Sequence, residues 1–185
     1  YQYLVHKNLN ELEIYKHIIN NKDYTLIHLD EKWFSELYIK SLSKIDPNQN
    51  QFINFINNLL NAKKNNLFIT TGLIKIEFVE NLIKSFFTKV CENLYVYECN
   101  ECKVYLYTKS SIEDLELLTM NSNRLITCNG PLTQVAISFG IPVIDILEKS
   151  LESWYDRHIH NKDNYIKLYR KPFENLSKEI INVTK

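Results

Sequence analysis

Residues 124–146 constrain the fold more than any other part of the chain. An apolar segment over residues 125–127 is followed by a polar turn, a short apolar helix pattern and a second apolar segment over residues 143–146. Gly140 fits the end of the helix, and Pro142 prevents the helix from continuing. The helix pattern keeps i, i+3, i+4, i+7 spacing at Leu132, Val135, Ala136 and Phe139. The segment therefore predicts a strand, a helix and a second strand, which is the repeating unit of a parallel sheet.

The turn at residues 128–131, Cys-Asn-Gly-Pro, is the first candidate site. The predicted helix begins where a parallel strand ends. Its free backbone N–H groups and the positive end of its dipole therefore lie at the carboxyl edge of the sheet. Pro131 has no N–H group, but its fixed φ suits the first position of a helix. This turn is thus expected to hold phosphate groups.

The rest of the chain alternates between strand and helix patterns. Asp46-Pro47 resembles a helix start, and Ser110 with Glu113 has the spacing of a capping box. Residues 94–97 and 104–107 have strand character and are compatible with a hairpin, and residues 165–169 fit a last strand or a loop. Further strands are expected at residues 24–29 and 67–70. Helices are expected over residues 10–20, 33–41, 47–60, 76–90 (burying Ile76, Val79, Ile83, Phe86 and Val90), 110–120 and 173–181.

Several strands that are each followed by a helix imply parallel pairing with right-handed crossovers. The expected α/β fold is one doubly wound, mainly parallel sheet with helices on both faces. We expect residues 1–185 to form a single Rossmann-like domain, with a lead-in helix within 1–23 and a C-terminal helix within 170–185. The chain begins at Tyr1 and not at Met, which suggests a domain of a longer protein.

Charge and composition narrow the function classes. Lysine plus arginine and aspartate plus glutamate both number 22, and this balance argues against broad electrostatic binding to nucleic acid. Neither a charged-then-apolar leader nor a transmembrane segment is recognisable, so a cytoplasmic location is expected. Cys99 and Cys102 have metal-knuckle spacing, but Cys91 and Cys128 do not form the second pair of a zinc site. Reduced thiols and no bound metal are expected.

The residues resemble glycosyltransferase family 9, the heptosyltransferase-like enzymes of lipopolysaccharide assembly. The resemblance covers Tyr24 to Ile181. It includes Lys32-Trp33 after the first strand, the Gly72 turn that precedes an acidic helix, and the serine-capped helix at residues 110–118. Counted back from Gly140-Ile-Pro142, Asn129 stands where the family has an aspartate and Gln134 stands where it has a histidine. The family's Gly-Pro-Thr turn after the last strand is replaced by residues 147–155.

The resemblance implies the C-terminal, nucleotide-sugar-binding half of a two-domain GT-B glycosyltransferase. Such an enzyme transfers a sugar from a nucleoside-diphosphate sugar to a glycan or lipid-linked acceptor of a bacterial surface polysaccharide. The general base then belongs to an N-terminal acceptor-binding domain, so no catalytic residue is assigned in this chain. No cofactor is implied besides the nucleotide-sugar substrate, and the location implied is cytoplasmic or at the inner face of the membrane.

The resemblance also implies roles for individual residues. Lys32 would contact the donor diphosphate, together with N–H groups at the start of the helix after Pro131. Thr71 and Gly72 would let the nucleotide approach the backbone, and Glu77 or Glu80 would accept hydrogen bonds from the ribose. The complete set of candidate binding residues is Lys32, Thr71, Gly72, Glu77, Glu80, Asn129, Gly130, Pro131, Leu132, Thr133 and Gln134.

Two alternatives remain open. The first is another nucleotide-dependent enzyme on the same scaffold, such as a sugar-nucleotide epimerase. The second is a non-catalytic interaction domain with a degenerate site, which the residues at positions 129 and 134 favour. Individual residues also have structural explanations. Lys32 fits a solvated surface lysine, Glu77 and Glu80 fit the outer face of a helix, and Trp154 fits rim packing or stacking near a sugar.

Overall fold

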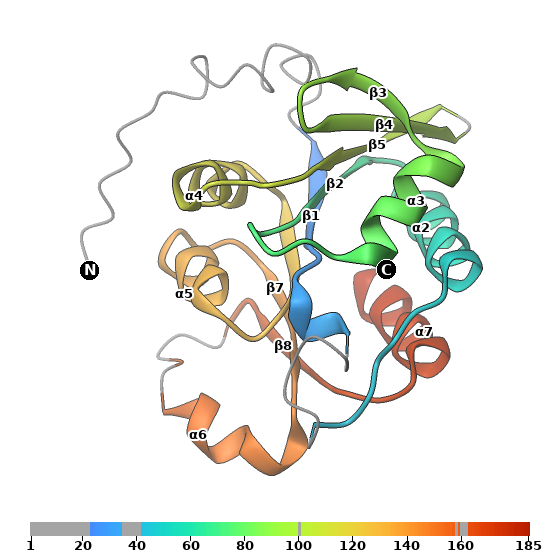
Figure 1. Ribbon diagram of the computed structural model, residues 1–185. Helices are drawn as coiled ribbons and strands as arrows, with labels where there is room; N and C mark the ends of the chain where they lie inside the picture. Colours follow the sequence, from blue (N-terminus) through green and yellow to red (C-terminus); the bar gives the residue numbers. More distant parts are fainter. Residues whose placement is uncertain (1–22, 35–41, 100, 158, 160–162) are drawn as a thin grey trace.

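The computed structural model describes residues 23–34, 42–99, 101–157, 159 and 163–185. In this part of the chain, eight strands form one sheet in the order β3-β4-β5-β2-β1-β6-β7-β8 (Figure 1). The strands are β1 (Tyr24–His28), β2 (Asn66–Thr70), β3 (Thr88–Cys91), β4 (Leu94–Cys99), β5 (Cys102–Tyr107), β6 (Arg124–Cys128), β7 (Val143–Leu147) and β8 (Tyr165–Tyr169).

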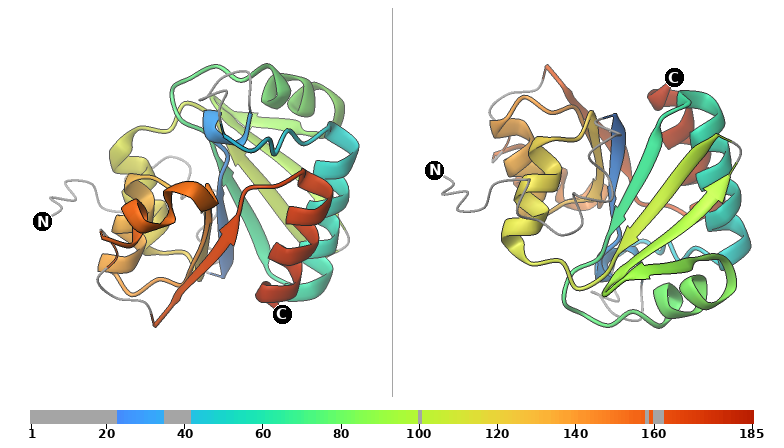
Figure 2. Two further views of the ribbon diagram at one scale, coloured as in Figure 1. Left: turned by 90° about the horizontal axis from the view of Figure 1, so that it is seen from below. Right: turned by 90° about the horizontal axis from the view of Figure 1, so that it is seen from above.

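Helices cover both faces of the sheet (Figures 1 and 2). One face carries α2 (Gln49–Lys63), α3 (Glu77–Phe86) and α7 (Phe173–Thr184), and the other carries α4 (Ile112–Met120) and α5 (Pro131–Ser138). Short elements follow two strands: η2 (Glu31–Trp33) after β1, and η3 (Lys149–Leu151) with α6 (Glu152–Asp156) after β7. This arrangement confirms the predicted doubly wound α/β fold. Within the described residues, no helix is long and apolar enough to cross a bilayer.

The strand order places a topological switch between β1 and β6. From β5 to β8 across the sheet, the neighbours β5, β2, β1, β6, β7 and β8 pair in parallel. From β1 the chain first builds outward through β2 and then returns to add β6 on the other side of β1. Ligands of open α/β sheets bind in the crevice at such a switch, outside the carboxyl ends of the strands.

The remaining strands form an antiparallel extension at one edge. Strand β4 pairs antiparallel with both β3 and β5, so the predicted hairpin at residues 94–107 is confirmed. The predicted end of helix α3 is wrong. The helical pattern of residues 76–90 predicts that α3 continues to residue 90, but residues Thr88–Cys91 form strand β3. Helix α3 ends at Phe86, and Val90 lies in β3 with 39% of its surface exposed. A second correction is Phe139, which follows α5 and is 40% exposed where the pattern predicts burial.

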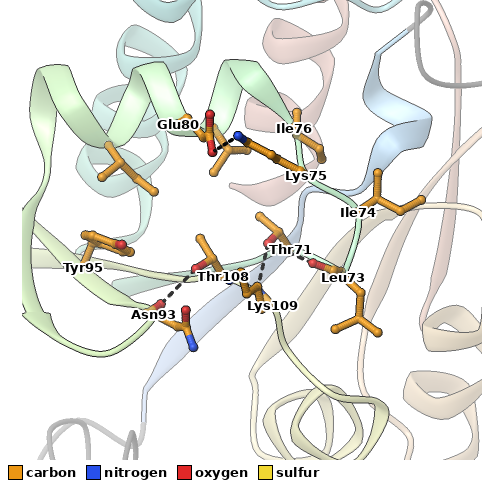
Figure 3. Close-up of a pocket in the computed structure, with 13 residues that line it drawn as sticks. Thr71, Leu73, Ile74, Lys75, Ile76, Glu80, Asn93, Tyr95, Thr108 and Lys109 are labelled. Carbon is orange, nitrogen blue, oxygen red and sulfur yellow. Dashed lines mark hydrogen bonds and ion pairs between the residues drawn. The ribbon is translucent and has the colours of Figure 1, made fainter.

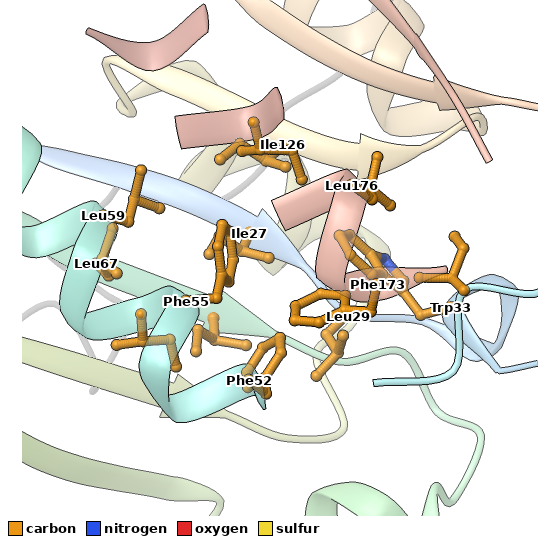
Figure 4. Close-up of a cluster of buried hydrophobic side chains, with 14 of the residues drawn as sticks. Ile27, Leu29, Trp33, Phe52, Phe55, Leu59, Leu67, Ile126, Phe173 and Leu176 are labelled. Carbon is orange, nitrogen blue, oxygen red and sulfur yellow. The ribbon is translucent and has the colours of Figure 1, made fainter. Parts of the chain in front are cut away.

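Aromatic side chains form the larger of two apolar cores. Phe52 and Phe55 of α2 pack against Phe173 of α7, with ring centroids 5.9 and 5.6 Å apart, above Ile27 of β1 (Figure 4). Trp33 is fully buried in the same core, 6.5 Å from Phe173. A smaller core on the opposite face joins the sheet to α4 and α5. Since both faces of the sheet are covered, the carboxyl edge is the natural place for a ligand.

Two predicted helix starts shift by one or two residues. Asn48, and not Asp46, caps α2, and Asp46 has a positive φ of 38°. Ser111 and Asp114 form the capping box of α4, one residue after the predicted Ser110 and Glu113. The expected helix over residues 10–20 and most of the one expected over 33–41 lie outside the described residues. Trp33 itself belongs to the 3-10 turn η2.

We expect Asn48→Ala to lower the free energy of unfolding by about 1 kcal/mol. The Asn48 side chain accepts a hydrogen bond from the backbone N–H of Gln51 at 2.9 Å, and the Gln51 side chain accepts one from the N–H of Asn48 at 3.2 Å. Urea denaturation followed by circular dichroism measures the change. Asn58→Ala, at an exposed position of the same helix, is the matched control and should be neutral or slightly stabilising.

Candidate functional site at the carboxyl edge of the sheet

Lys32 lies at the switch point between β1 and β6. Its ammonium donates a hydrogen bond to the backbone carbonyl of Asn129 at 2.9 Å and forms an ion pair with Asp30 at 2.7 Å. The Lys32 side chain is only 15% exposed, so it is not a solvated surface lysine. Burial opposes its charge, but the Asp30 carboxylate outweighs burial and raises the pKa of Lys32. The ammonium is therefore a fixed positive charge at the start of α5.

Local hydrogen bonds hold the turn that carries Lys32. Asp30 caps η2, because its carboxylate accepts a hydrogen bond from the backbone N–H of Lys32 at 3.1 Å. The indole N–H of Trp33 donates to the carbonyl of His28 at 2.9 Å, and its ring is buried in the larger core. Asp30 thus orients the Lys32 side chain, and Trp33 fixes the backbone next to Lys32. The contact of His28 Nδ1 with Thr70 Oγ1 at 3.1 Å joins this turn to the end of β2.

A second cation lies beside this ion pair. The Arg170 guanidinium is buried, and its Nε donates a hydrogen bond to the carbonyl of Ser43 at 2.9 Å. It is close enough to Asp30 to favour the charged form of that carboxylate, although burial still raises the Asp30 pKa. The Asp30 carboxylate thus lies near two cations, and Glu31 and Asp145 add further negative charge near Lys32.

A buried carboxylate orients the Asn129 side chain. The Asn129 amide donates to Asp145 Oδ2 at 3.3 Å, and the Tyr165 hydroxyl donates to the same oxygen at 2.9 Å. Asp145 Oδ1 and the Thr133 hydroxyl, both buried, have no partner with hydrogen-bond geometry. Burial raises the pKa of Asp145 to about 6, against the effect of these neighbouring donors. The turn is therefore built on a polar cluster beneath α5.

The predicted residues at the start of α5 differ in accessibility. Gly130 and Gln134 are half-buried, Pro131 is exposed at the first helical position, and Leu132 and Thr133 are buried. The N–H of Thr133 already donates to the carbonyl of Gly130 at 3.1 Å. The accessible parts of this turn are thus the backbone around Gly130 and the ammonium of Lys32.

We expect Gly130→Ala to displace the Lys32 ammonium with little effect on the fold. A Cβ atom at residue 130 would lie 2.7 Å from Lys32 Nζ, and the lysine end must move because the backbone around it is fixed. The expected cost in the free energy of unfolding is about 1–3 kcal/mol, because the displaced ammonium weakens its hydrogen bond to Asn129 and its ion pair with the buried Asp30. Thermal unfolding tests the stability, and a lowered affinity for a diphosphate tests the displacement. Gly72→Ala is the control for the stability measurement alone, because a Cβ there meets nothing within 4 Å but the residue lines the proposed nucleotide pocket.

A pocket of about 350 Å³ opens beside this corner at the ends of β2 and β5 (Figure 3). Thr71 and Gly72 form its floor together with Thr108 and Lys109, whose N–H donates to Thr71 Oγ1 at 3.3 Å. Glu80 of α3 lines the pocket and pairs with Lys75 at 3.0 Å. Of the predicted residues, Thr71, Gly72 and Glu80 line the pocket and Glu77 does not. Asn93 and Tyr95 of the antiparallel extension close it on the other side.

The pocket and the Lys32 corner lie on the same edge of the sheet. Thr71 follows β2 and Asn129 follows β6, and β1 lies between these two strands. Two strand spacings correspond to roughly 10 Å. The candidate residues thus form two neighbouring groups: Thr71, Gly72 and Glu80 at the pocket, and Lys32 with Asn129 to Gln134 at the corner. An extended ligand that spans three strand ends would contact both groups.

Sequence reasoning missed Asp30, His28, Arg170 and Asp145. Asp145 did carry a signal, since it is a lone charged residue within the apolar run of β7.

The two tryptophans lie in different environments. Trp33 is buried in the core, whereas Trp154 is 54% exposed and its ring contacts Tyr155. Among the residues that the structure describes, no three histidine, cysteine, aspartate or glutamate side chains gather in a group that could hold a metal ion.

Solved structures with this fold include an enzyme determined in complex with UDP-GlcNAc and UDP. No known protein family and no curated protein matches the sequence. The structure of UDP-GlcNAc 2-epimerase from Methanocaldococcus jannaschii matches 97% of the chain with a TM-score of 0.57 and 12% identity. The complex of that enzyme with UDP-GlcNAc and UDP matches 93% with a TM-score of 0.52 and 14% identity. The solution structure of ALG13 matches 91% with a TM-score of 0.51 and 14% identity.

These similarities establish a Rossmann-like α/β fold. The chain spans 44% and 42% of the two epimerase chains, which is less than half their length, and 87% of ALG13. At these identities the similarity concerns the fold and not the chemistry. The resemblance to heptosyltransferases remains a prediction from the sequence.

Proposed function

We propose that this chain is the nucleotide-sugar-binding domain of a GT-B glycosyltransferase. The observation that carries the proposal is the position of the Lys32 ammonium, 2.9 Å from the Asn129 carbonyl at the start of α5. A fixed cation beside a helix N-terminus, at the switch point of an open sheet, suits a diphosphate. The similarity in fold to an epimerase solved with UDP-GlcNAc and UDP supports the same ligand class.

The proposed chemistry is sugar transfer with departure of a nucleoside diphosphate. An acceptor hydroxyl attacks the anomeric carbon, the bond from that carbon to the diphosphate oxygen breaks, and negative charge grows on the leaving group. Lys32 and the backbone N–H groups at the start of α5 would stabilise that charge. A general base outside this chain would take the hydroxyl proton, as expected for a base that belongs to an N-terminal acceptor-binding domain.

The nucleoside would occupy the pocket beside Thr71 and Gly72. The pocket's volume of about 350 Å³ is at the lower end of the range for small-molecule sites. Glu80 could accept hydrogen bonds from ribose hydroxyls once its exposed ion pair with Lys75 opens, and such a pair holds its partners only weakly. Glu77, outside the pocket, is not assigned a role in this arrangement.

The finer assignment is a heptosyltransferase-like enzyme of bacterial lipopolysaccharide or surface polysaccharide assembly, located in the cytoplasm. The acceptor would be a glycan or a lipid-linked sugar. The sequence resemblance alone supports this assignment. Asn129 has no carboxylate and its amide N–H donates to Asp145, so only its side-chain oxygen remains as an acceptor for the donor sugar. The donor is therefore a nucleotide sugar whose sugar is not specified.

A sugar-nucleotide epimerase is the second candidate, since the UDP-GlcNAc 2-epimerase fold matches 97% of the chain. Both enzymes bind a nucleoside diphosphate, and they differ in what happens to the sugar. An epimerase inverts a sugar carbon and keeps the nucleotide attached, whereas a transferase releases the nucleoside diphosphate when an acceptor is present. NMR of the full-length protein with UDP-GlcNAc separates these two outcomes.

Calorimetric titration with ADP, UDP, GDP and CMP tests the proposal. We expect one of the diphosphates to bind with one site per chain, and CMP to bind more weakly because it has a single phosphate. The affinity for the diphosphate should fall as salt concentration rises, because the recognition is electrostatic. If none of the four nucleotides binds to a chain that circular dichroism shows to be folded, the domain is a non-catalytic relative of this fold.

A further inference from the structure

The tip of the β4–β5 hairpin brings two cysteines together. Cys99, the last residue of β4, and Cys102, the first residue of β5, are directly paired in the antiparallel register. Directly paired residues of antiparallel strands have Cα atoms about 4.5–5.5 Å apart. A disulfide needs Cα atoms about 4.4–6.8 Å apart, so the Cα separation of this pair lies within the range, and formation of the bond needs the Cβ atoms to approach to about 3.5–4.5 Å.

Both thiols lie on the same face of the hairpin. Strand side chains alternate between faces, so Tyr97 and Cys99 of β4 share one face, and Cys102 and Val104 of β5 share one face. All four residues pack against the core that joins the sheet to α2 and α7. The intervening Glu98 and Lys103 form a cross-strand ion pair at 3.0 Å, which the alternation places on the opposite face. The two thiols therefore lie on one face of the hairpin at directly paired positions.

The base of this pair is anchored in the sheet. The N–H of Lys103, next to Cys102, donates to the side chain of Asn66 at 2.8 Å, and the Tyr97 hydroxyl donates to Asn57 of α2 at 3.2 Å. These contacts hold β5 at the residue next to Cys102 and β4 at the residue two positions before Cys99. The folded chain thus holds the thiols near each other instead of leaving their encounter to random motion.

The pair is accessible and separate from the other two cysteines. Cys99 and Cys102 are free and half-buried, whereas Cys128 is fully buried. Cys91 packs against the core on the opposite face of the sheet, so it cannot replace either member. Among the described residues, no third ligand joins the two thiols in a potential metal site. A dithiol with this geometry is suited to oxidation rather than to metal binding.

We propose that Cys99 and Cys102 form a reversible redox pair whose co-substrate is a disulfide such as oxidised glutathione. The thiolate of one cysteine attacks a glutathione sulfur, which breaks the glutathione disulfide, forms a mixed disulfide and releases one glutathione thiolate. The other cysteine then attacks the protein sulfur of the mixed disulfide, and the second glutathione leaves. The two cysteines lose two electrons and two protons, and the two glutathione thiols gain them.

This redox pair is independent of the proposed nucleotide site. Cys99 and Cys102 lie where β5 begins, whereas Thr108 and Lys109 of the pocket follow the point where β5 ends. The redox behaviour is thus testable on the chain alone, whether or not the chain binds a nucleotide.

Incubation of the native chain with oxidised glutathione tests the pair. We expect the intact mass to fall by two hydrogen atoms, two titratable thiols to disappear, and peptide mapping to identify a Cys99–Cys102 link that dithiothreitol reverses. Cys91→Ser should behave as the parent. Cys99→Ser and Cys102→Ser should each stop at the mixed disulfide with glutathione, and circular dichroism should show that both variants stay folded.

The equilibrium constant for disulfide formation with glutathione shows whether the fold favours the Cys99–Cys102 link. We expect it to favour the disulfide at least about tenfold more in the native chain than in urea, because the fold holds the thiols together. Equal constants in the two states, a link that includes Cys91, or mixed disulfides without an internal link in the parent chain would each overturn the proposal.

Discussion

Replacing Lys32 by alanine is expected to weaken nucleoside-diphosphate binding by about 10- to 100-fold. A hydrogen bond to a charged group contributes about 1.5–3 kcal/mol, and each 1.4 kcal/mol corresponds to a tenfold change in affinity. Calorimetry with the diphosphate that binds the parent chain measures the loss. Lys178→Ala is the control, since its ammonium pairs with Glu174 on the exposed side of α7, and its affinity should equal that of the parent.

The same substitution also removes the partner of a buried carboxylate. Asp30 is 5% exposed, and removal of one member of a buried ion pair costs about 3–5 kcal/mol of stability. Lost binding in Lys32→Ala could then reflect unfolding. The double variant Asp30→Asn with Lys32→Met removes both charges and keeps the side-chain volume, so we expect it to fold and not to bind.

Asp30→Asn alone is expected not to weaken diphosphate binding. In this variant the Lys32 ammonium still donates a hydrogen bond to the Asn129 carbonyl, but the carboxylate 2.7 Å away that neutralises its charge is absent. Diphosphate affinity should therefore stay the same or rise. Parent-like affinity in the folded double variant would show that Lys32 does not contact the ligand, and the proposed site would then be wrong.

The arrangement of the sheet could be predicted because its local signals agree. Residues 124–146 form β6, α5 and β7 as expected, and Gly140 ends the helix in the left-handed region with a φ of +70°. The apolar faces of α2 and α7 follow from helical spacing, and the paired strands β4 and β5 follow from their alternation. These features depend on contacts between residues that are near in sequence.

The errors arise where two patterns fit the same residues. Val90 continues the helical spacing of α3, but Phe87 is extended and the strand β3 begins at Thr88. As an exposed edge strand, β3 lacks the alternation that marks a half-buried strand. Two consecutive serines, Ser110 and Ser111, are each followed three residues later by an acidic side chain, so spacing alone does not decide which one caps α4.

The candidate site could be predicted only in part, because its electrostatics depend on distant residues. The family resemblance led us to expect Lys32 and the turn after β6 at the same diphosphate. The ion pair of Lys32 with Asp30 depends on the conformation of η2, which the sequence pattern does not predict. Arg170 is distant in sequence from this turn, and it donates a hydrogen bond to the carbonyl of Ser43. The pocket walls at Asn93 and Tyr95 come from the antiparallel extension, and the parallel-sheet pattern carries no information about that extension.

Asp145→Asn is expected to stabilise the protein at neutral pH by about 1–3 kcal/mol. Burial raises the pKa of Asp145 from 3.8 to about 6, so the native state favours the protonated carboxyl. The stability from this preference is complete below pH 4 and is lost as the pH rises through about 6. A shift of about two pKa units corresponds to roughly 3 kcal/mol. Asparagine keeps an acceptor for Tyr165 and adds an N–H donor near the unpartnered Thr133 hydroxyl.

His28 contributes a pH dependence of the opposite sign. Burial, aided by the Lys32 ammonium, lowers the pKa of His28 from 6.5 to about 4, so the native state favours the neutral ring. The stability from this preference is complete above pH 6.5 and is lost as the pH falls through about 4. Between pH 4 and 6 the contributions of His28 and Asp145 therefore offset each other, and the parent chain should show a shallow pH profile in this range.

Urea denaturation at pH 4.5 and pH 7 distinguishes the two contributions. In Asp145→Asn the His28 contribution is no longer offset by Asp145, so the free energy of unfolding should rise more between these pH values than it does in the parent chain. Tyr165→Phe removes a donor that favours the charged carboxylate, which raises the Asp145 pKa further and makes stability fall with pH. If Asp145→Asn destabilises the protein at pH 7 as much as at pH 4.5, the buried carboxylate is charged at both pH values and its protein donors stabilise that charge. The polar cluster beneath α5 would then stabilise the native state through its hydrogen bonds, and the Asp145 carboxylate would not destabilise the native state at neutral pH.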